Sequence, residues 1–512
     1  MALSFSASFK KNAAALAVCM IIGAVLSLLL RFEIYYDLLH YHYYNGFAFV
    51  HDRLEIDVAP ANIHTFFNPL ADALNWFLIK HLNNFPNVYL AITGSVFGML
   101  LFICMKIYLL FFQNKFAVAA ALVLGTTGFA TWFQIGTTTN EIPAAVLVLT
   151  ALYFILKGEK ELFAAFLLGA AAGLKLTAAT YCLSSGIAFL LFNFRNPKQV
   201  ALFALCGVGG FLAIDGFWAW RLFNLYQNPF FPFLNGLFHS PYFADINFSI
   251  QAFEAPQIDK SFISLLFLPL LLISVTKGAE PTLDHLNFSD FRWFLACVLL
   301  IIWIFKTHKA PLSRQEKFLM VWLILSWLIW FKVFLVVRYL IPVETMLPVF
   351  FVKAAISLKP SAGSVLKQAV KIFLCLFCFF ICIGTTWNSD YWSRRTEQTL
   401  LPPLPCAMNV PDGTLFLTAS EGNSAFLAQI AEKRKIRIVN RFENLWKYIA
   451  ETKWGEEIKS AARSAAPKAY WITGRHNIDT HTMKCIHDKE NTHTVCFPEK
   501  IADTVCPSSR PR

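Results

Sequence analysis

Long uninterrupted apolar runs dominate the first three quarters of the chain. The first, Ala13 to Leu30, has about 18 residues, close to the roughly 20 that a helix needs to cross a bilayer. Lys10 and Lys11 precede it and no small-residue cleavage site follows, so we expect an uncleaved first helix with a cytoplasmic amino end. Similar runs recur to about residue 387, which predicts about eleven transmembrane helices. The later runs are 88–112, 116–135, 142–157, 162–174, 176–193, 200–220, 291–305, 318–331, 339–352 and 370–387.

Basic residues gather in alternate turns between these runs. Lys115, the pair Lys157 and Lys160, and Arg195 fall in the turns that an alternating scheme places inside, as positive charge in cytoplasmic loops requires. The run 261–275 breaks the scheme if it crosses, so we interpret it as a re-entrant or interfacial helix. The carboxyl end then lies outside.

After about residue 390 the chain becomes charged and loses its long apolar runs. Short β-type segments at 414–418, 436–440 and 469–473 alternate with helical patterns at 422–433 and 442–453. The sequence therefore predicts a transmembrane domain over 1–390 and a small α/β extracytoplasmic domain over 391–512. In an oxidising compartment Cys485 and Cys496 are the nearest pairing for a disulfide in this tail.

Composition supports a membrane protein. Hydrophobic residues make up 57% of the 512 residues and charged residues 15%, whereas soluble domains carry about 25% charged residues. The net charge of +12 could suggest nucleic-acid binding, but most lysines and arginines lie in short turns between apolar runs, where they set orientation. No nucleic-acid partner is expected.

The first outer loop, 31–87, begins with the polar aromatic stretch RFEIYYDLLHYHYYNG. A helix from Glu33 ending at Gly46 would place four side chains on one face. A carboxylate among aromatic rings can act as a general base, which we assign to Asp37; capping of a surface helix is the alternative. The candidate substrate-binding residues of this loop are His40, Tyr41, His42, Tyr44 and Asn45, and of these the shared face holds His40, Tyr41 and Tyr44 beside Asp37.

A second outer turn, GTTTNEIP at 136–143, places Asn140 and Glu141 at the mouth of the next helix pair. Glu141 could supply a second acid, and Asn140 a substrate contact. The alternative is an amino-terminal helix cap followed by Pro143 in the first turn. Asp37 and Glu141 are also the obvious oxygen donors for a divalent cation, Mg²⁺ or Mn²⁺. For His40 and His42, sugar contact or packing is favoured over metal binding.

Cations at span ends are candidates for holding a phosphate. Arg338 lies near the outer end of a span, where a buried cation needs an anion, and its planar fork suits phosphate. A salt bridge to Glu344, also counted among the binding candidates, is the alternative. Lys175 is a second phosphate candidate, with snorkelling to the headgroups as its alternative. His239 belongs to an outer segment, 228–243, suited to an isoprenoid chain or to the interface.

Together these placements resemble the GT-C superfamily of integral membrane glycosyltransferases. The likeness covers roughly residues 10–390 and rests on Asp37 just after the first span, the loop sequence DLLHYHYYNGFAFVHDRL, Asn140 with Glu141, and Arg338. NPFFPFLN followed by SPYF also looks like the outer loop of bacterial members. The family's pair of adjacent acids is not present in the first loop, because Asp37 has no acidic neighbour.

The resemblance implies a transferase that takes a hexose or pentose from a polyprenyl-phosphate donor, with inversion. It implies Asp37 as base, Glu141 as second acid, Arg338 as phosphate contact and, in some members, a divalent ion. The expected partners are the lipid-linked sugar, a glycan, lipid or protein acceptor, and membrane lipids. We expect a multi-pass protein of a bacterial inner membrane with a periplasmic tail. The alternatives are a transporter or flippase of a lipid-linked glycan, and a non-catalytic membrane scaffold.

Overall fold

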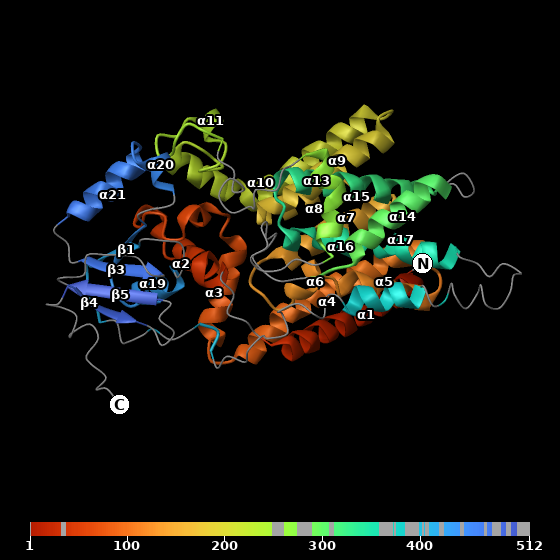
Figure 1. Ribbon diagram of the computed structural model, residues 1–512, viewed down its shortest axis with the longest axis horizontal. Helices are drawn as coiled ribbons and strands as arrows, with labels where there is room; N and C mark the ends of the chain where they lie inside the picture. Colours follow the sequence, from red (N-terminus) through yellow and green to blue (C-terminus); the bar gives the residue numbers. More distant parts are fainter. Residues whose placement is uncertain are drawn as a thin grey trace, which may run out of the picture. The chain divides into compact units, whose positions relative to one another are not determined.

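The computed structural model describes residues 2–31, 37–247, 261–273, 289–306, 312–357, 372, 375–384, 399–401, 404, 409–418, 424–440, 445–464, 468–473, 483–487 and 493–498 (Figure 1). The chain folds into two compact units, each built from separate stretches of sequence. Unit 1 contains 1–32, 90–216 and 250–396. Unit 2 contains 33–89, 217–249 and 397–512, so the tail from residue 397 groups with the first outer loop.

Helices make up the described part of unit 1. Five helical segments of the chain are long and apolar enough to cross a membrane: Lys10–Leu30, Pro86–Phe111, Leu176–Asn193, Pro197–Tyr226 and Val337–Ile356. The full count of eleven spans stays a prediction. The helices are α1 (Ala2–Leu30), α4 (Pro86–Phe111), α5 (Lys115–Thr126), α6 (Phe129–Phe133), α7 (Glu141–Lys157), α8 (Glu161–Leu174), η4 (Leu176–Ala178), α9 (Ala179–Asn193), α10 (Pro197–Tyr226), α13 (Phe262–Leu271), α14 (Arg292–Lys306), α15 (Arg314–Val333), η6 (Val337–Leu340), α16 (Ile341–Met346) and α17 (Pro348–Ser357).

Exposed apolar side chains cover the outer faces of the long helices. Ile21 and Leu29 on α1 are 63% and 71% exposed, and Leu205 on α10 is 65% exposed. Such surfaces are costly in water and suit contact with lipid. Within its described residues, 261–273, the predicted re-entrant run at 261–275 forms the ten-residue α13, about half the length that crosses a bilayer.

Two predicted spans are interrupted. The run 116–135 forms α5 and the separate short helix α6, and 339–352 is divided between η6, α16 and α17. Apolar composition alone does not show these breaks. Buried carboxylates from distant segments accept hydrogen bonds from the backbone at the start of α6. They stabilise the break between α5 and α6.

Glycine lets α1 and α4 approach closely. Gly94 and Gly98 are spaced four apart on α4, and a Cβ at either position would overlap α1. Gly23 of α1 lies against both of them. This small-residue contact brings two backbones together without larger side chains, as in many membrane helix pairs, and the two helices run side by side in Figure 1.

Unit 2 contains a five-stranded sheet in the order β2–β1–β3–β5–β4. β1 is parallel to β2 and β3, whereas β5 is antiparallel to β3 and β4. The strands predicted at 414–418, 436–440 and 469–473 correspond to β1, β2 and β3. The strands are β1 (Leu415–Thr418), β2 (Arg437–Asn440), β3 (Lys468–Thr473), β4 (Met483–His487) and β5 (His493–Pro498).

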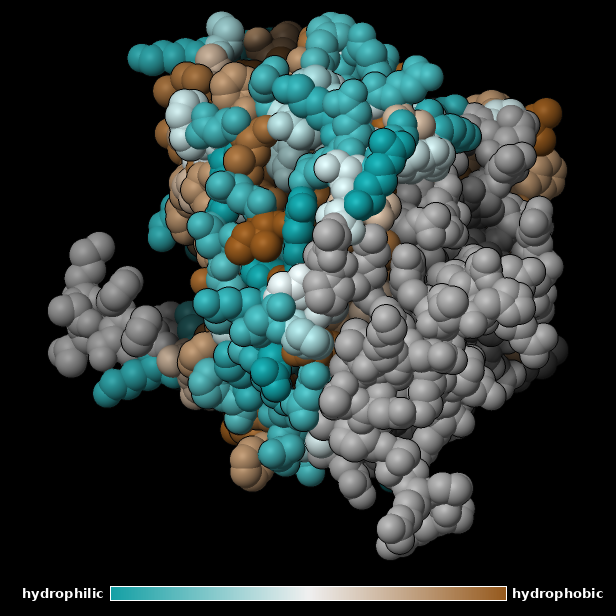
Figure 2. Space-filling model, turned by 90° about the vertical axis from the view of Figure 1, so that its left-hand side faces the viewer, coloured by the Kyte–Doolittle hydropathy of each residue, from teal (hydrophilic) through white to brown (hydrophobic). Residues whose placement is uncertain are grey.

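The helices of unit 2 come from the loop, from 217–249 and from the tail. They are η1 (Leu38–His42), α2 (Tyr43–Val50), η2 (Arg53–Glu55), η3 (Asn62–Phe66), α3 (Leu70–Leu82), α11 (Asn235–Phe238), α19 (Ser424–Ala431), α20 (Trp446–Ile449) and α21 (Lys453–Arg463). Seen from the side of the sheet, the described surface is mainly hydrophilic with scattered apolar residues (Figure 2). Such a surface suits an aqueous setting.

The predicted helix that ends at Gly46 is corrected by the structure. Residues 38–42 form one wide π-helical turn, and α2 continues through Gly46 to Val50. Gly46 is not a terminus but a contact point, because a Cβ there would overlap the backbone of Asp72 and the Cβ of Trp76 on α3. The beginning of the predicted helix, 33–36, lies outside the described residues.

The first loop joins the edge strand of the tail's sheet. Val58 pairs with Val439 of β2: the Val58 N–H donates to the Ile438 carbonyl at 2.8 Å, and the Asn440 N–H donates to the Val58 carbonyl at 2.9 Å. Two polar contacts extend this pairing. Asp57 accepts from the Ile438 N–H at 2.8 Å, and Arg53 donates to the Ile436 carbonyl at 2.6 Å.

The register of β4 and β5 sets Cys485 opposite Cys496. We expect these two cysteines to form a disulfide when the tail lies in an oxidising compartment. Alkylation under non-reducing conditions followed by mass spectrometry should recover a linked 485–496 peptide from cells. Recovery of two free, alkylated thiols would contradict the outside placement of the tail, and Cys104, buried in α4, serves as the unlinked control.

Candidate functional site

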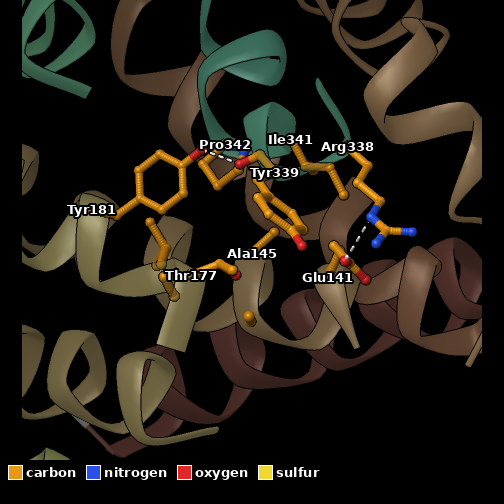
Figure 3. Close-up of a pocket in the computed structure, with 11 residues that line it drawn as sticks. Glu141, Ala145, Thr177, Tyr181, Arg338, Tyr339, Ile341 and Pro342 are labelled. Carbon is orange, nitrogen blue, oxygen red and sulfur yellow. Dashed lines mark hydrogen bonds and ion pairs between the residues drawn. The ribbon is translucent and has the colours of Figure 1, made fainter. Parts of the chain in front are cut away.

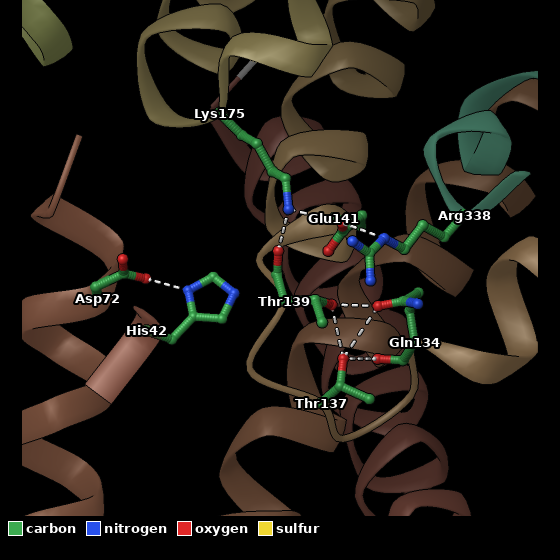
Figure 4. A network of polar contacts seen from close by, with 8 residues as sticks. All are labelled: His42, Asp72, Gln134, Thr137, Thr139, Glu141, Lys175 and Arg338. Atoms are coloured by element: carbon green, nitrogen blue, oxygen red, sulfur yellow. Dashed lines mark hydrogen bonds and ion pairs between the residues drawn. The ribbon is translucent and has the colours of Figure 1, made fainter. Parts of the chain in front are cut away.

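In unit 1, two cations share one carboxylate. The Lys175 ammonium lies 2.6 Å from Glu141 Oε1, and Arg338 Nε lies 3.6 Å from the same oxygen (Figure 4). All three side chains are largely buried, with 14%, 13% and 4% exposed for Lys175, Arg338 and Glu141. Two positively charged side chains thus meet at one carboxylate.

Irregular backbone positions each of these side chains. Glu141 is the first residue of α7, and Asn140 before it has a left-handed φ of 64° without a side-chain cap bond. Lys175 stands in extended backbone between α8 and η4, and its ammonium also donates to the Thr139 carbonyl. Arg338 lies in η6, directly after the break that ends α15. Charges are therefore gathered where helices end.

The turn before Asn140 is braced by its own side chains. Gln134 Oε1 accepts from the hydroxyls of Thr137, at 3.2 Å, and Thr139, and these two hydroxyls are 2.8 Å apart (Figure 4). The bracing holds the Thr139 carbonyl in the position where Lys175 reaches it. Asn140 occupies the cap position predicted for it, although its side chain makes no cap bond.

A small pocket, with a cavity volume of about 20 Å³, lies beside Glu141 and Arg338. Glu141 and Arg338 line one end, and Tyr181, Tyr339 and Pro342 line the other (Figure 3). The Tyr339 ring lies 5.7 Å from the Lys175 ammonium and 5.5 Å from the Arg338 guanidinium carbon. The lining of this pocket therefore combines charged and aromatic side chains.

Glu344 does not pair with Arg338, so that predicted alternative is wrong. Its carboxylate accepts from the backbone N–H groups of Ala130, at 3.0 Å, and Thr131, at 2.9 Å. Asp290, itself paired with Arg292 at 2.9 Å, accepts from the Phe129 N–H at 3.1 Å. These carboxylates bind the start of α6 because its first N–H groups have no partner within the helix.

Unit 2 gathers three histidines from the first loop. The rings of His40 and His64 are 5.0 Å apart, and Tyr41 stacks on His64 at 4.7 Å and lies 4.1 Å from His42. Asp37, buried, is close enough to His40 to act on its charge. Asp37, His40, Tyr41 and His42 of the sequence prediction are all buried in this loop.

A carboxylate holds one of these imidazoles. His42 Nδ1 lies 2.6 Å from Asp72 Oδ1, with 3% and 4% of the two side chains exposed (Figure 4). Asp72 comes from the first turn of α3, thirty positions later in the chain. Neither Asp72 nor His64 stands out in the sequence; the only signal for either is a polar residue in a largely apolar helical or aromatic segment.

The remaining residues predicted to bind substrate, Tyr44, Asn45 and His239, interact with other residues of unit 2. The Tyr44 hydroxyl donates to Asp57 at 2.7 Å, and Asn45 donates to the His64 carbonyl at 2.8 Å. Both bonds hold the loop together. His239 is 65% exposed and pairs with Asp245 at 2.6 Å, on the surface of unit 2.

Asp37 and Glu141, the predicted metal ligands, belong to different units. Within the described ranges, no group of three or more His, Cys, Asp or Glu side chains has a metal-binding arrangement. At Glu141 the residues do not fit a divalent cation, because one carboxylate oxygen already faces two positive side chains. A third cation there would be repelled.

No protein-family model, curated protein or solved structure matches the chain. The structure itself shows a helical protein with five apolar helices long enough to cross a membrane.

Because His40 is buried, we expect the stability of unit 2 to depend on pH. Burial, with a smaller effect of His64, lowers the pKa of His40 well below its ordinary value of 6.5, while Asp37 opposes the shift. The unfolded chain thus takes up a proton at a pH where the folded chain does not. We expect stability to fall as pH drops below about 6.5, by up to about 1.4 kcal/mol per pH unit for this one proton.

Melting temperatures of wild type and His40→Phe between pH 5 and pH 8 test this expectation. The His40→Phe protein should lose less stability on acidification than wild type. Equal acid sensitivity of both proteins would contradict the assignment, and His81→Phe, at the exposed end of α3, provides the control.

Proposed function

We propose that the chain is a membrane glycosyltransferase that moves a hexose or pentose from a polyprenyl-phosphate donor to an acceptor on the outer face of the membrane. The observation that carries the proposal is the cation pair Lys175 and Arg338 around Glu141, beside the aromatic pocket. A lipid-linked phosphate has an anionic group for the cations and an apolar chain for the aromatic side chains.

The transfer consumes no cofactor. An acceptor hydroxyl attacks the anomeric carbon of the sugar, and the bond from that carbon to the phosphate oxygen breaks. The electron pair leaves with the polyprenyl phosphate, whose charge Lys175 and Arg338 stabilise. One displacement inverts the anomeric centre. In this scheme Glu141 keeps the two cations in place until the phosphate arrives.

The acceptor proton needs a base, which we place on the first loop of unit 2. The sequence hypothesis is Asp37, a buried carboxylate beside His40. The dense set of hydrogen-bonding groups in this loop supports the proposal, because proton transfer requires a positioned partner. We further propose a bacterial inner membrane with unit 2 on the periplasmic side, where a glycan, lipid or protein would accept the sugar.

Transfer of radiolabelled sugar tests the function. The full chain in lipid nanodiscs is supplied with a panel of polyprenyl-phosphate hexoses and pentoses and with a membrane extract as acceptor source. Label should move from the donor to a second molecule, and an Arg338→Gln protein should transfer far less than an Arg314→Gln control. No transfer from any donor would overturn the proposal. Movement of intact donor across liposomes without transfer would favour a flippase.

A further inference from the structure

A second pocket of unit 1 lies between the first turns of α8 and α10. It shares no lining residue with the pocket beside Glu141 and Arg338. Its cavity volume is about 440 Å³, within the range of about 300–1,000 Å³ that is typical of ligand pockets. Lys160 and Lys198, which line it, are exposed, so the pocket is open to the surface.

The pocket lies where a close glycine contact between the two helices ends. A Cβ at Gly169 of α8 would overlap the Gly207 carbonyl of α10, and a Cβ at Gly173 would lie 3.0 Å from the Phe211 carbonyl. Because the contacts follow the same order along both helices, α8 and α10 run parallel. No glycine precedes Gly169 in α8 or Gly207 in α10. Larger side chains therefore separate the first turns of the two helices.

A chain of hydrogen bonds fixes the polar wall of this pocket. Gln199 Nε2 of α10 donates to Glu161 Oε2 of α8, and Asn196 Nδ2 donates to Gln199 Oε1 at 3.1 Å. The backbone N–H of Gln199 donates to Asn196 Oδ1 at 3.3 Å. One oxygen of the acidic side chain in the lining is therefore bound by α10.

Lys160 and Lys198 supply the positive charge of the pocket. Among the described residues, neither ammonium has a carboxylate within ion-pair distance, although Lys160 lies 5.5 Å from the Phe154 ring. The lining contains two ammonium groups and one carboxylate, that of Glu161, which is bound by the other helix. An anion within reach of both lysines is therefore attracted to the pocket.

The position of the pocket on α10 indicates the source of such an anion. α10 is long and apolar enough to cross a membrane, and Lys198 is its second residue. In a bilayer its first turn lies at the level of the lipid headgroups, on the side that the basic turns predict to be cytoplasmic. Beside and beyond the pocket, Leu162 and Phe166 of α8 and Leu202 and Leu205 of α10 are exposed. These side chains suit contact with acyl chains.

We propose that this pocket binds an anionic phospholipid, with the phosphate at Lys160 and Lys198 and the acyl chains on the apolar faces of α8 and α10. Basic pockets between membrane helices on the cytoplasmic side are suited to such headgroups. A choline lipid carries its own cation next to the phosphate and gains less from two lysines. The site is separate from the proposed sugar transfer and does not depend on it.

Native mass spectrometry of the full chain in detergent tests the proposal. Titration with phosphatidylglycerol, which is anionic, or with phosphatidylcholine gives the dissociation constant of the first bound lipid. Wild type should bind phosphatidylglycerol at least about tenfold more tightly, because each basic residue near a headgroup strengthens binding about fivefold. The double variant Lys160→Gln, Lys198→Gln should lose this preference. The control Lys11→Gln, Lys115→Gln removes two exposed lysines outside the pocket and should keep it.

A second variant tests the cavity without changing its charge. In Leu202→Trp a larger side chain occupies the space between the helices, so most of the preference for phosphatidylglycerol should be lost. Leu202 is 39% exposed, which allows the ring to be accommodated without disturbing the core. Leu205→Trp, on the same helix but outside the lining, is the matched control and should bind as wild type does.

Equal affinity of wild type for the two lipids would overturn the proposal, whichever variants fold. An equal loss in the Lys11, Lys115 control would attribute the effect to general surface charge, and normal binding by Leu202→Trp would place the anion outside the pocket. Displacement of the lipid by an equal concentration of inorganic phosphate would identify a free-phosphate site instead. No sugar donor enters these measurements, so their outcome is independent of the transfer assay.

Discussion

Replacement of Asp57 by alanine is expected to destabilise unit 2 by about 3–5 kcal/mol, the cost of leaving a buried ion unpaired. The Arg53 guanidinium holds the Asp57 carboxylate with two bonds, at 2.7 and 2.9 Å, and the Asp57 side chain is fully buried. The same carboxylate accepts from the Tyr44 hydroxyl and from the Ile438 N–H. Its loss removes the acceptor of the Tyr44 hydroxyl and of the Ile438 N–H, and it leaves Arg53 with its bond to the Ile436 carbonyl.

Thermal unfolding and limited proteolysis measure this effect. For a unit of this size, the expected loss corresponds to a fall of about 10 °C in Tm, with new cleavage between the loop and the tail. Glu457→Ala is the matched control, since Glu457 forms an exposed pair with Arg437 at 2.5 Å. Exposed pairs contribute about 0–1 kcal/mol. Equal effects of the two substitutions would show that the buried pair does not join loop and tail.

Removal of the two cations of unit 1 is expected to have the largest effect on transfer. Each of Lys175→Met and Arg338→Met should lower kcat/KM about tenfold to a hundredfold, since a hydrogen bond to a charged group contributes about 1.5–3 kcal/mol. The loss should be greatest for Arg338, whose planar fork can hold two phosphate oxygens. Arg338→Lys keeps the charge without the fork and should fall between wild type and Arg338→Met.

A compensated variant keeps this test independent of folding. Loss of the cations leaves Glu141 buried without a partner, which could itself unfold unit 1. The double substitution Glu141→Gln, Arg338→Met removes one charge of each sign and should fold, yet still bind the donor poorly. Lys157→Met and Arg314→Met on exposed positions are controls. Normal donor affinity in the compensated protein would contradict phosphate binding by Arg338.

The sequence predicts local features well and distant pairings poorly. Apolar runs mark the helices, and β-type segments mark β1, β2 and β3, because both patterns are periodic and local. The break between α5 and α6 was not predicted, since Glu344 and Asp290 reach it from positions more than 160 residues away. No periodicity in 116–135 carries that information.

The same distinction holds for the candidate sites. The sequence marks Lys175, Glu141 and Arg338 as candidates because each is a charged residue at the end of an apolar run. It does not predict that the two cations share the Glu141 carboxylate. Asp72 was overlooked because its single acidic side chain in an apolar helix resembles a surface position. The 2.6 Å contact between its carboxylate and the His42 ring shows that it faces His42 instead.

The pairing of Val58 with Val439 has a consequence for biogenesis. Residues near the beginning of the chain acquire their hydrogen-bond partners only after nearly 440 residues have been synthesised. Until then Asp57 and Arg53 have no strand to bind. The chain therefore remains immature through most of its insertion, and a ribosome that stalls before the tail would leave a membrane-inserted precursor whose early loop has not matured.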